Sequence, residues 1–144
     1  MTRVTRRYRF SASHRLHADQ LSDEENRQVY GKCDNPYGHG HNYEIEVSAR
    51  GPVDPRSGRV LDPRGLDRLV EEHVLRAFDL TYLNEQAAFR SLVPTTENLG
   101  NEIFHRLKTN WPSFFAGEWP RLDKVRVLET SRNMFEISET NGEV

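Results

Sequence analysis

The feature that most limits the possible folds is a strict alternation of apolar and polar residues between positions 43 and 50. Successive side chains of a strand point to opposite faces of a sheet, so this pattern predicts one buried face and one hydrated face. A strand of this kind is typical of an antiparallel sheet that helices cover on one side only. The residues expected on the buried face are Tyr43, Ile45, Val47 and Ala49.

The rest of the chain supplies further strands and two helices. Asp62 and Pro63 begin a helix that is expected to run to about Phe78, and Thr95 begins another. We expect loops at residues 18–32 and an irregular stretch at residues 79–93. The order of strands and helices along the chain predicts an α+β domain whose antiparallel four-stranded sheet carries both helices on one face. The expected strands are residues 4–14, 43–50, 124–129 and 133–138, with a short hairpin arm at residues 59–61.

Length and composition favour a single domain that spans residues 1–144. A formal net charge of −2 excludes an extended basic surface for nucleic acid or acidic membranes. The longest apolar runs are far too short to cross a membrane, and the basic N-terminus lacks the apolar core of a signal peptide. One cysteine cannot form an internal disulfide, which fits the cytoplasm. A hydrophobic fraction of 35% predicts a marginal monomer or a subunit that buries more surface in an oligomer.

The segment from Cys33 to His41 holds the strongest chemical signal. His39 and His41 are separated by one residue, so a strand there would place both imidazoles on one face. Two neighbouring imidazoles predict a zinc site, for which His14 and His17 are both candidates as the third ligand. Cys33 is a candidate fourth ligand, a catalytic thiolate or a small buried residue.

Further polar residues could complete a site around this segment. Thr95, Thr96 and Glu97 form a good helix N-terminus, and they could equally form the polar edge of a substrate pocket. Glu129 falls on the apolar face of its predicted strand, where a carboxylate needs a partner such as the N–H edge of a heterocycle. Asp79 follows the first helix and is either a catalytic acid or an ordinary helix-terminal aspartate.

Together these segments resemble the 6-pyruvoyl-tetrahydropterin synthase family over most of the chain. The spacing Cys-x5-His-Gly-His is specific: the related 6-carboxy-tetrahydropterin synthases have a shorter gap, so the chain is similar to the pyruvoyl branch. The resemblance implies that His14, His39 and His41 bind Zn2+ and that Cys33 is catalytic. The matching segments are residues 10–16, 22–26, 31–43, 94–98 and 129–130.

The same resemblance implies a fold, an assembly and a reaction. The fold is the tunnelling fold, or T-fold, in which sheets of several subunits join into a barrel and two trimers form a homohexamer. Thr95, Thr96 and Glu129 fall in the pterin pocket, with Glu129 at the amino-pyrimidine edge. The implied reaction converts 7,8-dihydroneopterin triphosphate to 6-pyruvoyl-tetrahydropterin with loss of triphosphate.

One position departs from the family pattern. The family usually has Asp-His where this chain has Asp79-Leu80, and a leucine cannot relay a proton. Losing one member of a proton relay costs roughly 10²- to 10⁴-fold in rate. Three functions therefore stay open: the zinc-dependent lyase, a 6-carboxy-tetrahydropterin synthase or aldolase-like side-chain cleavage, and a pterin-binding protein with weak or no turnover.

Overall fold

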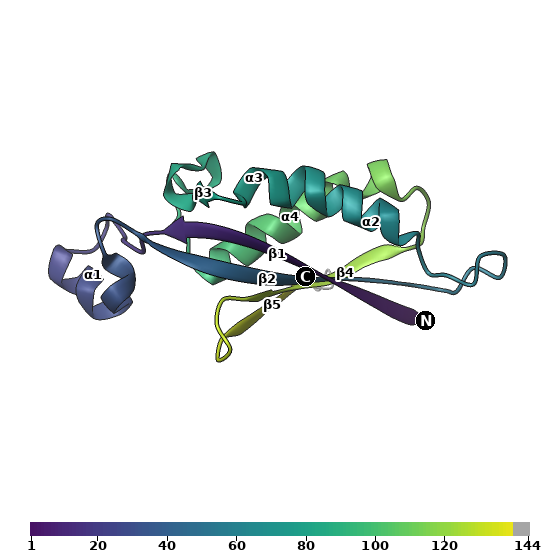
Figure 1. The fold of residues 1–144 in the computed structure, drawn as a ribbon, viewed down its shortest axis with the longest axis horizontal. Helices are drawn as coiled ribbons and strands as arrows, with labels where there is room; N and C mark the ends of the chain where they lie inside the picture. The colour runs from purple at the N-terminus through teal and green to yellow at the C-terminus, as the bar shows by residue number, and fades with distance from the viewer. Residues whose placement is uncertain (140–144) are drawn as a thin grey trace, which may run out of the picture.

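The computed structural model describes residues 1–139, which form one sheet with the longer helices on one of its faces (Figure 1). Within residues 1–139 the sheet has five strands, in the order β3-β1-β2-β4-β5, so the predicted four strands are one too few. The additional strand is β3, which pairs with β1 in parallel at Ala12 and Ser13, whereas the other neighbours are antiparallel. The strands are β1 (Thr2–His14), β2 (His39–Gly51), β3 (Thr81–Tyr82), β4 (Arg121–Leu128) and β5 (Met134–Ser138).

Both predicted helices are present and begin where their capping residues predict. Asp62 accepts a hydrogen bond from the Arg64 N–H and opens α2 (Pro63–Val70), which continues through a π-helical turn, η2 (Glu71–Leu75), into α3 (Arg76–Phe78). Thr95 caps α4 (Thr96–Phe114) in the same way through the Asn98 N–H at 3.2 Å. Among residues 1–139, no helix is long and apolar enough to span a membrane.

Two local expectations are wrong. The segment expected as a loop contains α1 (Asp23–Tyr30), because Ser22 and Glu25 form a capping box at its start. The helix leads into a short 3₁₀ turn, η1 (Gly31–Asp34). The hairpin arm expected at residues 59–61 is a turn connection rather than a strand, closed by the Asp54 N–H on the Arg59 carbonyl at 2.9 Å.

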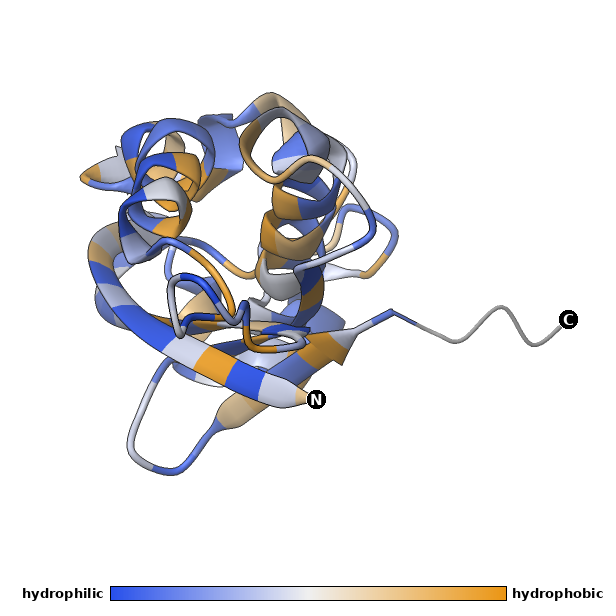
Figure 2. Cartoon of the chain, turned by 90° about the vertical axis from the view of Figure 1, so that its right-hand side faces the viewer, coloured by the Kyte–Doolittle hydropathy of each residue, from blue (hydrophilic) through white to orange (hydrophobic). Residues whose placement is uncertain are grey.

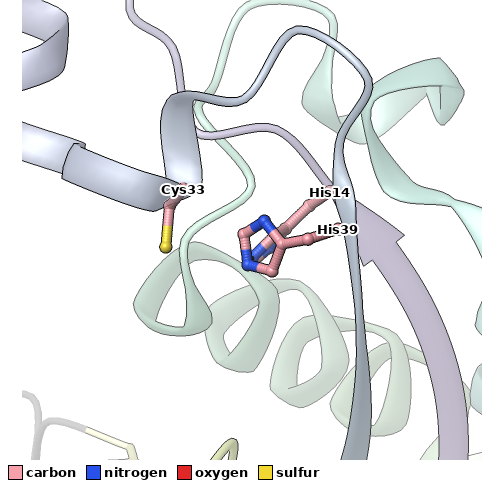
Figure 3. A group of neighbouring side chains, drawn as sticks. All are labelled: His14, Cys33 and His39. Carbon is pink, nitrogen blue, oxygen red and sulfur yellow. The ribbon is translucent and has the colours of Figure 1, made fainter.

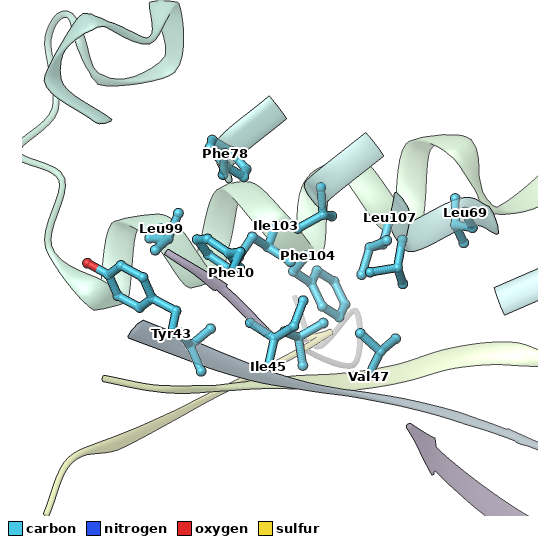
Figure 4. Close-up of a cluster of buried hydrophobic side chains, with 14 of the residues drawn as sticks. Phe10, Tyr43, Ile45, Val47, Leu69, Phe78, Leu99, Ile103, Phe104 and Leu107 are labelled. Atoms are coloured by element: carbon cyan, nitrogen blue, oxygen red, sulfur yellow. The ribbon is translucent and has the colours of Figure 1, made fainter. Parts of the chain in front are cut away.

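The hydrophobic core lies between the sheet and the helices (Figure 4). The alternation predicted for β2 is confirmed, because its four apolar residues are buried on the helix side. The side chains of β1 alternate in the same way between more and less exposed from Val4 to His14. Figure 2 shows the molecule from the right-hand side of Figure 1, with the helices above the sheet. Gly100 lets α4 approach the sheet closely, since a Cβ at this position would overlap Ile137. Residues at the centre of the core include Phe10, Ile45, Val47, Phe78, Leu99, Ile103 and Leu107.

The opposite face of the sheet carries ion pairs instead of helices. Arg7 binds Glu46 at 2.8 Å, and Arg126 binds Glu136 on the neighbouring strand at the same distance. On the helix side, Asp67 of α2 accepts two hydrogen bonds from Arg6, at 2.8 and 2.9 Å, and one from the Tyr8 hydroxyl at 2.7 Å. This cluster fastens α2 to the first strand.

Candidate active site

Three histidines meet at the end of the long β1–β2 pair. His14 is the last residue of β1 and lies opposite His39, the first residue of β2. The Nε2 atom of His39 is 3.2 Å from Nε2 of His14 and 2.6 Å from Nε2 of His41. The prediction that His39 and His41 share a face is therefore confirmed, and His14 joins them.

The buried His14 ring has the tautomer that a metal ligand needs. Its Nδ1 lies 2.9 Å from the Pro94 carbonyl oxygen, to which it donates, so the lone pair of Nε2 points into the cluster. Burial lowers the pKa of His14 to about 4, and it also lowers the pKa of His39. Both rings are therefore neutral near pH 7, which is the ligand form of imidazole. The Nδ1 atom of His39 has no hydrogen-bond partner within residues 1–139.

Glu129 closes one side of the histidine cluster. One carboxylate oxygen lies 3.0 Å from Nε2 of His41 and 3.8 Å from Nε2 of His14. The other oxygen accepts a hydrogen bond from the Thr96 hydroxyl at 2.8 Å. The Glu129 carboxylate therefore has polar partners, as expected for an acid on the apolar face of its strand.

The other two residues of the predicted pocket edge are Thr95 and Glu97. The Thr95 side chain is occupied as the cap of α4, and Glu97 is exposed on the first turn of that helix. Within this group, Thr96 is the residue that the structure brings into contact with Glu129. The contacts of Thr95 and Glu97 are therefore those of a helix N-terminus.

Cys33 faces the histidines from the η1 turn (Figure 3). Its sulfur and the ring nitrogens of His14 and His39 all lie within 4.8 Å of one another, and a second such group consists of His14, His41 and Glu129. Burial raises the pKa of the Cys33 thiol, and the negative charge of Glu129 adds to this rise. The donor set of imidazoles, a thiol and a carboxylate around a common centre fits a zinc ion.

Asp79 and Leu80 are both hydrogen-bonded to the backbone of Ser11 on β1. The Asp79 carboxylate accepts a hydrogen bond from the Ser11 N–H at 2.9 Å, and the Leu80 N–H donates to the Ser11 carbonyl at 2.6 Å. Leu80 has a φ of 59°, and the residue is 84% exposed. A non-glycine residue in this backbone region is strained. No hydrogen bond joins either residue to Cys33 within the described part of the chain.

One site neighbour, Tyr43, was not identified from the sequence. The Tyr43 hydroxyl lies 3.2 Å from Nδ1 of His14, and the signal for it was available, because Tyr43 shares the strand face of His39 and His41. His17, the rival for the third ligand, turns away: its Nδ1 lies 2.7 Å from a carboxylate oxygen of Asp34. Nothing in the local sequence pattern revealed that pairing.

Comparison with known proteins agrees with this geometry. The family model described as 6-pyruvoyl tetrahydropterin synthase matches residues 3–140. The chain is 42% identical over 132 residues to 6-pyruvoyl tetrahydrobiopterin synthase of Homo sapiens. The match covers 91% of this chain and 87% of the relative. It is 41% identical to the Drosophila melanogaster protein of the same name, covering 91% of this chain and 76% of the relative.

A solved structure gives the same result for the fold. The Caenorhabditis elegans 6-pyruvoyl tetrahydropterin synthase superposes with a TM-score of 0.86 at 38% identity, and the match covers 96% of each chain. The predicted T-fold subunit is therefore confirmed, and the chain belongs to the 6-pyruvoyl tetrahydropterin synthase family.

Proposed function

We propose that this protein is a zinc-dependent lyase that converts 7,8-dihydroneopterin triphosphate to 6-pyruvoyl-tetrahydropterin and releases triphosphate. The observation that carries the proposal is the convergence of the His14, His39 and His41 Nε2 atoms beside one thiol and one carboxylate. The names of the relatives support the same activity.

The three histidines would hold the ion. Three imidazoles and an open position are the donor set of a catalytic zinc site. The chemistry that zinc supplies when bound is Lewis-acid polarisation of the hydroxyls on the substrate side chain. A nearby cation also favours a thiolate, which opposes the rise in the pKa of Cys33 that burial causes.

The chain's own residues would then bind the pterin and move the proton. Glu129, steadied by the Thr96 hydroxyl, would accept N–H groups from the amino-pyrimidine edge, with Thr95 and Glu97 at the rim of the pocket. The Cys33 thiolate would take the C1′ proton of the side chain and deliver it to the ring. Elimination of triphosphate and tautomerisation would complete the reaction.

We further propose that the working form is a cytoplasmic homohexamer of single-domain subunits, each comprising residues 1–144. Two edges of the described sheet support an assembly through strand pairing. β5 is the last strand on one side, and on the other side β3 pairs with β1 at Ala12 and Ser13 alone. Head-to-tail pairing of these edges would close a barrel from the sheets of three subunits. In such an assembly Asp79 could reach a Cys33 of another subunit, while within its own chain it accepts a hydrogen bond from the Ser11 N–H.

The direct test is to incubate the zinc-loaded protein with 7,8-dihydroneopterin triphosphate and to measure triphosphate release together with the mass of the pterin product. The proposal predicts one triphosphate per 6-pyruvoyl-tetrahydropterin formed. If a zinc-loaded protein binds the substrate but releases no triphosphate over hours, the lyase proposal is wrong.

Leu80 favours a second candidate on the same site. Because a leucine cannot return a proton, the intermediate could partition toward side-chain cleavage and give a 6-carboxy-tetrahydropterin or an aldolase-like product. The mass of the product separates this reaction from the first. Binding of a pterin without any product would instead identify the third candidate, a pterin-binding protein.

A further inference from the structure

The segment of residues 15–38, here called the Cys33 loop, connects β1 to β2 and carries α1 and η1. It projects beyond the end of the sheet, away from the helices that cover the core (Figure 1). The hydrophobic core cluster contains Ala12 and Tyr43 on either side of the loop, but no residue of the loop itself among the described ones. Apolar packing therefore does not determine where the Cys33 thiol sits.

Polar contacts hold the turn that carries Cys33. The Asp34 side chain is only 7% exposed, and one of its oxygens lies 2.7 Å from Nδ1 of His17 and 3.1 Å from a terminal nitrogen of Arg15. In the next peptide, the Cys33 carbonyl accepts a hydrogen bond from the Leu16 N–H at 2.7 Å. The turn is thus bound, side chain and backbone, to the three residues that follow His14.

Arg15, the first of those three residues, is itself tied to the body of the domain. Asn84 bonds both backbone groups of Arg15, because its side-chain oxygen accepts from the Arg15 N–H and its amide donates to the Arg15 carbonyl, each at 2.8 Å. Within the Cys33 loop, the fully buried Asn26 of α1 bonds both backbone groups of Ala18, at 2.7 and 2.9 Å. A continuous series of contacts therefore runs from Asn84 through Arg15 to Asp34, the neighbour of Cys33.

We propose that Asp34 is a positioning residue: its buried carboxylate, held by Arg15 and His17, fixes the Cys33 thiol opposite the three histidines. The expected change in kcat rests on the proposed lyase function. The position of the Cys33 thiol does not depend on that function. A base that transfers a proton must be held within hydrogen-bonding reach of its target, so a loose turn lowers turnover even when the fold is intact.

The test uses the full-length protein and the variant Asp34→Ala, with Asp34→Asn as a variant that keeps one acceptor for His17. Cys33 is the only cysteine, so alkylation by iodoacetamide reports on this thiol alone. The rate is compared at its high-pH plateau, where the thiol is fully ionised and only its accessibility differs. We expect Asp34→Ala to raise this rate about fivefold or more, with Asp34→Asn intermediate.

Three further readouts separate positioning from a general loss of structure. The kcat for triphosphate release should fall roughly tenfold while KM stays within about twofold. Zinc affinity, measured by competition with a chelator, should be unchanged, and Tm should stay within about 3 °C. Asp19→Asn is the matched control, because Asp19 is exposed in the same loop and should leave every readout unchanged.

Unchanged alkylation and unchanged kcat in Asp34→Ala would overturn the proposal. So would a large drop in Tm with parallel loss of zinc binding, because Asp34 would then act on the whole fold. If the wild-type protein itself releases no triphosphate, the proposed function fails, while the alkylation and zinc measurements still decide whether Asp34 positions the thiol.

Discussion

The packed body of the domain and the Cys33 loop are held together by different forces. In the body, Ile45 and Val47 are fully buried between the sheet and α4, and packing decides their positions. In the loop, the fully buried side chain is the polar Asn26, which is held by hydrogen bonds to the surrounding backbone. The proposed site lies at the boundary, with its imidazoles on strands of the body and its thiol on the loop. Apolar packing therefore holds the elements that carry the imidazoles, whereas polar contacts hold the turn that carries the thiol.

The largest effect that tests this division is expected from Cys33→Ala. Loss of the base should lower turnover roughly 10²- to 10⁴-fold. Because the loop contributes nothing to the core cluster, Tm should change by less than about 2 °C. Activity assays and thermal unfolding of the same preparation measure both quantities. A drop in Tm comparable to that of a core substitution would show that the loop is part of the stable unit.

A matched pair of valines tests the same division from the side of stability. Val47→Ala removes fully buried methyl groups, so it should lower the free energy of unfolding by about 2 kcal/mol. Val29 lies on α1 and is 62% exposed, and Val29→Ala should change that free energy by less than about 0.5 kcal/mol. Urea denaturation measures both, and equal effects would contradict the comparison.

Leu80→His tests whether the reaction is limited by the absence of a proton-carrying side chain at position 80. If the missing relay limits the reaction, the substitution should raise kcat about tenfold or more. Leu80→Asn is the control, because asparagine tolerates the positive φ of this position but does not relay protons at neutral pH. Equal rates in both variants and the wild type would mean that the reaction does not use a relay at this position.

The smallest expected effect concerns acid stability of the body. Hydrogen bonds from Arg6 hold the pKa of Asp67 below its ordinary value of 3.8. A carboxyl group whose pKa is lower in the folded state stabilises the fold above its unfolded pKa and loses that contribution as the pH falls through its folded pKa. Stability should therefore decline below about pH 4, and Asp67→Asn should weaken this dependence.

The size of this effect is limited by solvent. The Arg6 and Asp67 side chains are each 40% exposed, so we expect a contribution below about 1 kcal/mol. Thermal unfolding between pH 2 and pH 7, with wild type and Asp67→Asn in parallel, measures it on that scale. If the stability of Asp67→Asn falls with decreasing pH as steeply as that of the wild type, this ion pair does not contribute to acid stability.

Local patterns in the sequence were sufficient for much of the fold. Alternation in β2 predicted the buried face and the pairing of His39 with His41, and the caps Asp62 and Thr95 marked the helix starts. These features depend on neighbours within a few residues, so the sequence contains them directly.

Features that depend on distant contacts could not be predicted in the same way. β3 is two residues long and exists because β1 offers it an edge. α1 has few apolar residues, and its buried Asn26 is satisfied by backbone that precedes the helix. Thr96 and Glu129 meet only when α4 packs against β4. The residues alone left His14 and His17 as rivals for the third ligand, and the pairing of His17 with Asp34 is a contact that the local pattern does not reveal.

A zinc titration of the metal-stripped protein tests the central claim most directly. The protein is treated with a chelator, and triphosphate release from 7,8-dihydroneopterin triphosphate is measured as zinc is returned. Three histidines around one centre predict that activity rises linearly and reaches its plateau at one ion per chain, and that His41→Ala abolishes the response. Full activity in the stripped protein, or a plateau that His41→Ala leaves unchanged, would contradict the account.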